Sequence, residues 1–264
     1  MLNENQQHCL RGIGIRQPPR AHSAASNIVA EVGIPTIAPV KTEPLIPATV
    51  IRHIDPVITN PDPVPTAGPV VLNLGSWDDI NQSIQSCSAC ALAQNCTQKV
   101  PGTGSKTADL MIIGEGPGHD EDIRGEPFVG RSGQLLEKLL ASIGLDRDSV
   151  FMTNIVKCQP PNNRDPKPEE IAQCGQFLEA QIKSISPAII LSVGRISAHS
   201  LLGTTQPIGR LLNDMHQLPG SEIPLKVTYH PAYLLRNPAA KSLAWHDMKM
   251  LYAHLKQLID SASS

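Results

Sequence analysis

The chain has few aromatic side chains, almost no net charge and no long apolar run. Eight of its 264 residues are Phe, Tyr or Trp, and 22 Lys and Arg side chains against 24 Asp and Glu give a net charge of −2. A global electrostatic attraction to nucleic acid or membrane is therefore excluded, and any basic surface must be local. No apolar run approaches the roughly 20 residues that span a bilayer, and the first residues lack a signal-peptide pattern. We expect a cytoplasmic protein.

The first 75 residues differ in composition from the rest. All the aromatic residues lie beyond residue 75, whereas 11 of the 24 prolines lie before it. Proline disfavours helix, and without aromatic anchors the segment buries too little surface to offset its ordering entropy. The pattern predicts a disordered Pro-rich tether over residues 1–75, with no folded core before Trp77. Its Ile and Val residues leave open a short strand or a motif that orders on a partner.

Strand and helix patterns alternate from Ser76 onward, where a capping box begins a helix toward Cys87. Strands are expected at 110–113, 150–153, 188–193 and 225–229, and helices at 132–143, 168–185, 196–202, 208–212 and 238–259. This order predicts an α/β fold, a three-layer α/β/α sandwich with a four-stranded, mainly parallel sheet. The loops at 114–133, 154–168, from 194 and at 230–238 should meet at the carboxyl edge of that sheet.

Four of the six cysteines have a spacing typical of a metal site. Cys87 and Cys90 lie one helical turn apart, Cys158 follows a strand, and Cys174 lies near the start of the next helix. A sheet can bring such thiols together, and soft thiolates select zinc or an iron–sulfur cluster, which spacing does not distinguish. The alternative is that Cys158 and Cys174 are ordinary buried residues. The spare thiols would be Cys9 and Cys96.

The Gly-rich loop at 114–118 lacks the Lys-Ser or Lys-Thr ending of a P-loop, which disfavours nucleoside triphosphate binding. Acids in and after it, Glu115 and Glu121 among them, could position or deprotonate a water, or simply be solvated. Phe128, in a Gly- and Pro-rich loop, is suited either to stack on a flat ring or to anchor the loop.

Polar and apolar side chains follow two later strands. Asn154 offers a donor and an acceptor that match a pyrimidine edge, or it caps its strand. His230 is followed by Leu234, Leu235 and Arg236, where a leucine could wedge into a base stack and the arginine could meet a phosphate. A structural histidine is the alternative for His230.

Four ordered strings closely resemble the iron–sulfur uracil-DNA glycosylases, the fourth family of the uracil-DNA glycosylase superfamily. They are GEGPGHDED at 114–122, GEPFVGRSGQLL at 125–136, TNIVKCQPPNNRDP at 153–166 and HPAYLLRNP at 230–238. The four spaced cysteines lie in the expected places, and the similarity covers 76–264.

The resemblance implies a parallel four-stranded sheet and a mainly structural [4Fe-4S] cluster held by Cys87, Cys90, Cys158 and Cys174. It implies hydrolysis of the bond between uracil and deoxyribose in single- or double-stranded DNA, leaving an abasic site without a lysine nucleophile. The target base must leave the stack to be reached. We expect a monomer associated with the nucleoid, whose tether could recruit a replication or repair protein.

The resemblance also implies roles for individual residues. Glu115, Glu121 and His230 would be catalytic: the carboxylates for water placement and support, the imidazole to stabilise charge on a uracil oxygen. The substrate-binding residues would be Phe128 for stacking, Asn154 for base reading, Asn163 near the pocket, and Gly116, which replaces a water-positioning Asp of other superfamily members.

DNA would be contacted by Leu234 and Arg236, which enter at the lesion. The weak net charge is compatible with DNA binding if one edge carries the local cations Arg131, Lys157, Arg164, Arg195 and Arg236.

Three other functions compete with uracil release. One superfamily branch traps uracil-DNA covalently through a histidine in a basic insert, but Arg164–Pro168 contains no histidine. A domain that only binds DNA while its tether recruits replication proteins would not need Asn154, His230 and the acidic loop. A zinc-stabilised nucleotide-binding protein would be colourless, whereas an iron–sulfur protein absorbs broadly at about 400 nm.

Overall fold

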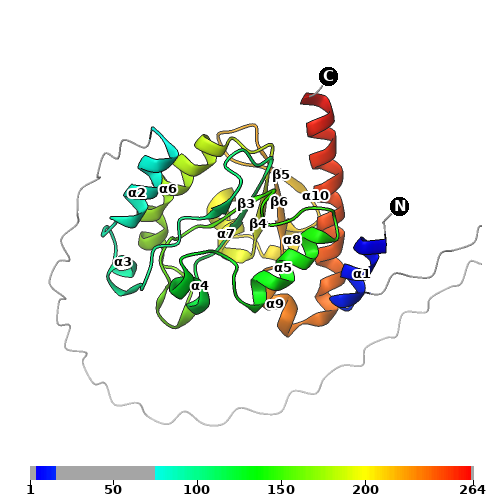
Figure 1. The fold of residues 1–264 in the computed structure, drawn as a ribbon, viewed down its shortest axis with the longest axis horizontal. Coiled ribbons are helices and arrows are strands. Elements are labelled where there is room, and N and C mark those ends of the chain that lie inside the picture. Colours follow the sequence, from blue (N-terminus) through cyan, green and yellow to red (C-terminus); the bar gives the residue numbers. More distant parts are fainter. Residues whose placement is uncertain (1–3, 16–74, 263–264) are drawn as a thin grey trace, which may run out of the picture. The chain divides into compact units, whose positions relative to one another are not determined.

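In the computed structural model, residues 4–15 and 75–262 are described. Their strands form a single sheet in the order β1-β3-β2-β4-β6-β5 (Figure 1). The strands are β1 (Thr103–Gly104), β2 (Leu110–Gly114), β3 (Phe151–Asn154), β4 (Ile189–Val193), β5 (Met215–Gln217) and β6 (Pro224–Thr228). The predicted four parallel strands are confirmed as β3, β2, β4 and β6. The sheet has six strands rather than four, because the short β1 and β5 add antiparallel edges.

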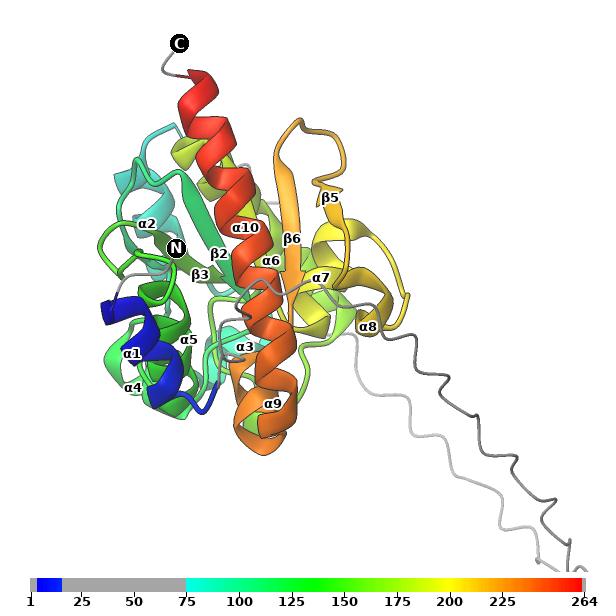
Figure 2. The same ribbon diagram turned by 90° about the vertical axis from the view of Figure 1, so that its right-hand side faces the viewer.

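Helices cover both faces of the sheet, which confirms the three-layer sandwich (Figure 2). One face carries α1 (Glu4–Gly12), α5 (Arg131–Ala141), α9 (Pro231–Arg236) and α10 (Lys241–Ala262). The other carries α3 (Ala91–Asn95), α6 (Pro168–Ile185), α7 (Arg195–Leu202) and α8 (Ile208–Leu211), with α2 (Trp77–Gln85) packed on α6. The remaining short helices are α4 (His119–Arg124), η1 (Pro161–Asn163) and η2 (Pro238–Ala240).

The strand side chains alternate between the two layers, as the two-residue period of a strand requires. In β2, Leu110 and Ile112 pack among α5 and α10, whereas Met111 and Ile113 pack among α6, α7 and α8. Both faces of this central strand are therefore buried, and its loop must leave from the end of the sheet. No helix among the described residues is long and apolar enough to cross a membrane.

The N-terminal helix α1 corrects the prediction that no core forms before Trp77. Leu10 is 1% exposed, Ile13 4% and Ile15 8%, and all three belong to the core cluster of α5 and α10. The Lys241 ammonium also donates to the Ile13 carbonyl at 3.0 Å. Aliphatic residues supply this contact, so a search for aromatic anchors misses it. The other residues of the predicted tether, except residue 75, are 1–3 and 16–74, and they lie outside the described residues.

We expect Leu10→Ala to lower the free energy of unfolding by about 2 kcal/mol or more, because it removes a buried aliphatic side chain. His8→Ala, on the exposed side of the same helix, should change it by less than about 0.5 kcal/mol. Urea denaturation measures both. Equal midpoints for the two variants would contradict docking of α1 in solution.

Candidate active site

The carboxyl ends of β2, β3, β4 and β6 open into one cleft of ≈ 870 Å³. The cleft gathers most of the site residues expected from the sequence. They are Glu115, Gly116, Glu121, Phe128, Asn154, Asn163, His230 and Arg236. The convergence follows from the parallel sheet, whose loops after each strand emerge at the same edge.

Phe128 forms a buried wall of this cleft in an unusual backbone conformation. Its φ is +57° and its exposed fraction is 3%. A non-glycine residue keeps such a conformation only when its surroundings hold it. Here the Phe128 N–H donates to Glu121 Oε1 at 2.7 Å, and Arg147 donates to the Phe128 carbonyl at 3.2 Å. The residue is thus a loop anchor whose ring also lines the cleft.

Glu121 is a positioning residue for this loop. One carboxylate oxygen accepts the Phe128 N–H, and the other accepts the Gly118 N–H at the start of α4. Burial raises the pKa of Glu121, and these two amides oppose that shift by stabilising the carboxylate. Of the two roles expected for Glu121, water placement and support, the hydrogen bonds match support.

Asn154 ends β3 directly beside Gly114, the last residue of β2. A Cβ at position 114 would lie 2.6 Å from Phe128 Cζ and would also collide with Asn154 Oδ1. Glycine therefore lets the ring and the amide meet over the strand end. Asn154 is 2% exposed, and among the described residues no hydrogen bond engages its side-chain amide. Its donor and acceptor stay available to a ligand.

Glu115 and His230 meet across Gly194, which has φ +98°. A Cβ at position 194 would lie 2.5 Å from Glu115 Oε1 and 3.1 Å from His230 Cβ, so glycine permits the approach. Glu115 Oε1 accepts the Ile196 N–H at 3.1 Å, in the first turn of α7. Burial raises the pKa of Glu115, and the amide opposes the shift.

His230 is the N-cap of α9, and its Nδ1 accepts the Ala232 N–H at 3.2 Å. That hydrogen bond places the proton of the neutral ring on Nε2. Burial, with the Arg236 charge adding to it, lowers the pKa of His230 to about 4. The imidazole is therefore a neutral donor at neutral pH.

Two predictions about DNA-facing side chains are wrong. Leu234 is 0% exposed and packs in the core, because α9 turns it inward, whereas Leu235 on the same helix is 37% exposed. Lys157 is 2% exposed and faces the interior of the sheet rather than the cleft. The Leu234 prediction fails because the sequence pattern indicates a loop at 230–238, whereas only the helix α9 fixes which leucine faces inward.

The remaining predicted cations do line the cleft, but two of them are paired. Arg164 forms a salt bridge with Glu170 at 2.7 Å, and Arg195 pairs with Asp165. The other two, Arg131 and Arg236, are exposed at its mouth.

Sequence reasoning missed several residues that shape the cleft. Arg147, in the connection between α5 and β3, holds the Phe128 loop, and no local sequence signal indicates this contact. Gly133 lets α5 approach the Phe128 carbonyl more closely than any side chain allows. Tyr229 and Tyr233 line the cleft, and their rings stack with centroids 4.7 Å apart. The two tyrosines are four residues apart in the sequence with His230 between them, and this spacing could have indicated that they meet.

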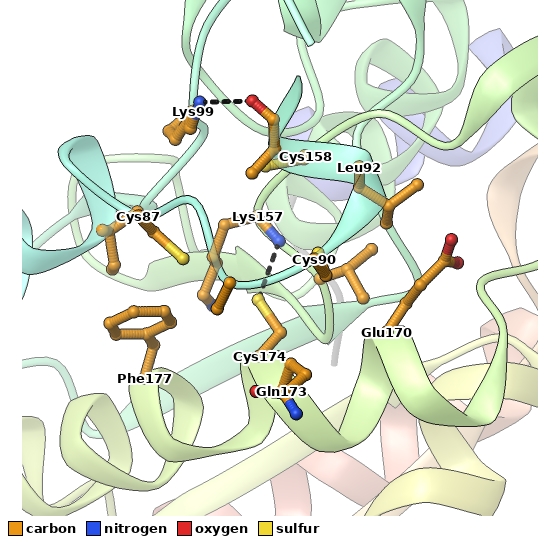
Figure 3. A pocket seen from close by; sticks show the side chains of 14 residues that line it. Cys87, Cys90, Leu92, Lys99, Lys157, Cys158, Glu170, Gln173, Cys174 and Phe177 are labelled. Carbon is orange, nitrogen blue, oxygen red and sulfur yellow. Dashed lines mark hydrogen bonds between the residues drawn. The ribbon is translucent and has the colours of Figure 1, made fainter. Parts of the chain in front are cut away.

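The four spaced cysteines line a second cavity, between α2, α3, α6 and the loop after β3 (Figure 3). Its apolar walls include Ile84, Leu92 and Phe177. In the described part of the chain, no three His, Cys, Asp or Glu side chains are gathered closely enough to hold one metal ion. Four thiols around one apolar cavity are nevertheless the donor set that suits an iron–sulfur cluster.

Burial and neighbouring side chains shift the pKa values of two of these thiols, Cys174 and Cys158. Burial raises the pKa of Cys174 to about 11, while the Lys157 ammonium and its amide N–H, 3.3 Å from Cys174 Sγ, oppose the shift. Burial also raises the pKa of Cys158, and the neighbouring Cys96 adds to this effect. Cys96 therefore lies beside Cys158.

Comparison with known proteins places this fold and cleft in a family. Residues 101–249 match the family model described as the uracil DNA glycosylase superfamily. The chain belongs to this superfamily, which confirms the resemblance noted from its motifs.

Several relatives carry the name type-4 uracil-DNA glycosylase. The protein of Archaeoglobus fulgidus is 41% identical over 182 residues, covering 67% of this chain and 92% of that protein. That of Saccharolobus solfataricus is 41% identical over 183 residues, 67% of this chain and 85% of its own length. That of Thermotoga maritima is 44% identical over 160 residues, 60% and 82% respectively.

We predict that His230 stays neutral well below its ordinary titration range. The unfolded imidazole binds a proton below pH 6.5, whereas the folded one does so only at about pH 4. In that window the unfolded state holds more protons, so the His230 contribution to stability is present above pH 6.5 and is lost as pH falls toward 4. Two-dimensional ¹⁵N NMR of the imidazole, with His230→Gln for assignment, measures this directly. A midpoint near 6.5 would contradict the buried setting.

Proposed function

We propose that this protein hydrolyses the N-glycosidic bond of deoxyuridine in DNA, releasing uracil and leaving an abasic site for base excision repair. The observation that carries this proposal is the meeting of Phe128, Asn154 and His230 in one cleft. A ring surface, an unengaged amide and a neutral N–H donor match the flat face, the pyrimidine edge and a carbonyl oxygen of uracil.

Bond cleavage leaves negative charge on the departing base and positive charge on the sugar. The Nε2–H of His230 donates to a uracil oxygen as that charge grows, and the bound base displaces the water that would compete for this donor. The Glu115 carboxylate, held beside His230 by the first turn of α7, faces the cationic sugar and positions the attacking water. Asn163, in η1 on the cleft wall, borders the same space.

Water, rather than the protein, is the nucleophile in this proposal. The cations at the mouth of the cleft are arginines, which stay protonated and form no Schiff base with a sugar aldehyde. The enzyme is therefore a monofunctional hydrolase. Gly116 leaves no carboxylate at its position, and a Cβ there would lie 2.8 Å from Val156 Cγ2.

The target base reaches this cleft by leaving the DNA stack, which costs less in single strands than in duplex. Leu235 and Tyr233 are each 37% exposed on α9 beside the cleft, placed to fill the gap that the base leaves. Arg131 and Arg236 at the mouth would bind phosphates on either side.

We propose further that Cys87, Cys90, Cys158 and Cys174 hold a [4Fe-4S] cluster. Four thiols from separate segments around one apolar cavity support this assignment. When bound, the group would tie α2, α6 and the loop after β3 together, and no step of base removal passes through it. The protein would act as a monomer in the cytoplasm on nucleoid DNA, where thiols stay reduced, with residues 16–74 recruiting a replication or repair protein.

The first test uses protein expressed in cells that lack their own uracil-DNA glycosylase. An oligonucleotide with one deoxyuridine should break at that position after alkali, and a thymidine control should not. His230→Ala and Asn154→Ala should each lower kcat/KM by about 100-fold or more, as loss of an oxyanion donor does. No breakage by folded wild-type protein would overturn the proposal and favour DNA binding without catalysis.

We also expect Leu235→Ala to lower kcat/KM on duplex DNA by about tenfold, while single-stranded DNA is cleaved at the wild-type rate. Filling the vacated stack is needed only where the base was stacked and paired. Leu243→Ala, 51% exposed and outside the cleft, is the matched control. Equal losses on both substrates would contradict the gap-filling role, and no loss on either substrate would place Leu235 outside the DNA contact.

A further inference from the structure

Lys157 is a buried cation between the candidate base-reading residue and the cysteine cavity. It lies three residues after Asn154 and one before Cys158, and its side chain is among the largest that are fully buried. Burying an ammonium is costly unless it is hydrogen-bonded and its charge is balanced. No role expected from the sequence explains why this charge is inside the protein.

The hydrogen-bond partners of this lysine suit its charged form. Nζ lies 2.7 Å from each of three oxygens, the Thr153 hydroxyl, the Asn154 carbonyl and Gln181 Oε1. The Thr153 hydroxyl donates its own proton to the Pro101 carbonyl at 2.7 Å, so it accepts from Lys157. Three acceptors use all three protons of an ammonium, whereas a neutral amine has only two.

The same contacts fix the end of β3. The Lys157 ammonium holds the Asn154 carbonyl, and Gln181 of α6 completes the set by donating to the Pro101 carbonyl at 2.7 Å. The backbone that carries the Asn154 amide is thereby tied to α6 and to the loop before β1. A shift of this cluster would move Asn154 within the cleft.

The balancing charge for Lys157 does not come from a carboxylate. Within the described residues no ion pair includes Lys157, whereas the other fully buried lysine, Lys226, pairs with Asp247 at 3.0 Å. Lys157 instead lines the cavity of the four cysteines, and its amide N–H donates to Cys174 Sγ (Figure 3). Four thiolates around an iron–sulfur core carry a net negative charge, which is the missing counterpart.

We propose that Lys157 is a positioning residue that balances the negative charge of the thiolate-bound group and, through the Asn154 carbonyl, fixes the base-reading amide. The inference rests on the proposed iron–sulfur cluster and on the proposed function of Asn154. Binding of the iron–sulfur cluster by the cysteines and the position of the Asn154 amide in the cleft are then linked through the Lys157 side chain.

The first test compares the iron–sulfur centre in wild-type, Lys157→Met and Lys157→Gln holoproteins. Both variants remove the positive charge, so the reduction potential should shift to more negative values in both, and iron should be lost to a chelator about 10- to 100-fold faster. The Gln variant keeps polar contacts and carries the test if the Met variant does not fold. The control Lys226→Met/Asp247→Asn removes a remote buried pair and should keep the wild-type potential and iron retention.

The second test asks whether Lys157 acts through Asn154. Lys157→Gln should lower kcat/KM for uracil release by about tenfold in the wild-type background. In the Asn154→Ala background it should cause little further loss, because the amide it positions is absent. Fully additive losses would overturn the link to Asn154.

The outcomes separate this inference from the proposals beneath it. Wild-type protein without iron and sulfide would overturn both the cluster and the charge-balancing role of Lys157. An iron-loaded wild type whose Lys157 variants keep its potential and iron retention would overturn the Lys157 role alone. Absence of uracil release with an intact cluster would overturn the proposed function and the Asn154 link, while the potentials still decide the charge-balancing role.

Discussion

The parallel pairing of β2 with β3 sets Gly114 beside Asn154, and the cleft is built around that pair. Because position 114 has no side chain, the Phe128 ring and the Asn154 amide can lie over the same strand end. The other cleft residues leave neighbouring strands at the same edge: Glu115 after β2, Gly194 after β4 and His230 after β6. A slip in this register would separate the ring from the amide.

Buried polar groups keep the cleft in shape. Glu121 accepts hydrogen bonds from two backbone amides, and Arg147 donates to the Phe128 carbonyl. Lys157 donates to the Asn154 carbonyl from the interior of the protein. Each of these groups is satisfied by partners within the protein, so the cleft residues are positioned before a substrate arrives. Such preorganised dipoles are the main source of catalytic power for a reaction in which charge develops.

The sequence was most informative where a local rule decides the structure. The capping box at Ser76, the proline at the start of α6 and the apolar runs of β2 and β4 each predicted an element that the structure contains. The motifs predicted which residues line the cleft, because they resemble the motifs of a known family. Parallel topology then explains why distant loops share an edge.

The predictions that failed depend on tertiary contacts. Leu234 and Leu235 are neighbours with the same chemistry, and only the packing of α9 decides which is buried. The prediction of Lys157 as a DNA contact fails because the sequence does not show that Gln181, 24 residues later, accepts a hydrogen bond from its ammonium in the interior. Helix α1 docks through aliphatic residues across a long sequence separation, which no local pattern encodes.

The most direct test of the base-reading cleft is a titration of ¹⁵N-labelled protein with free uracil, followed through the side-chain amide signal of Asn154. We expect this signal and the backbone amide signals of Gly116 and Phe128 to shift together, with one dissociation constant, and thymine to shift them far less. Saturating shifts confined to another surface, or an Asn154 signal that stays unchanged while uracil binds, would contradict it.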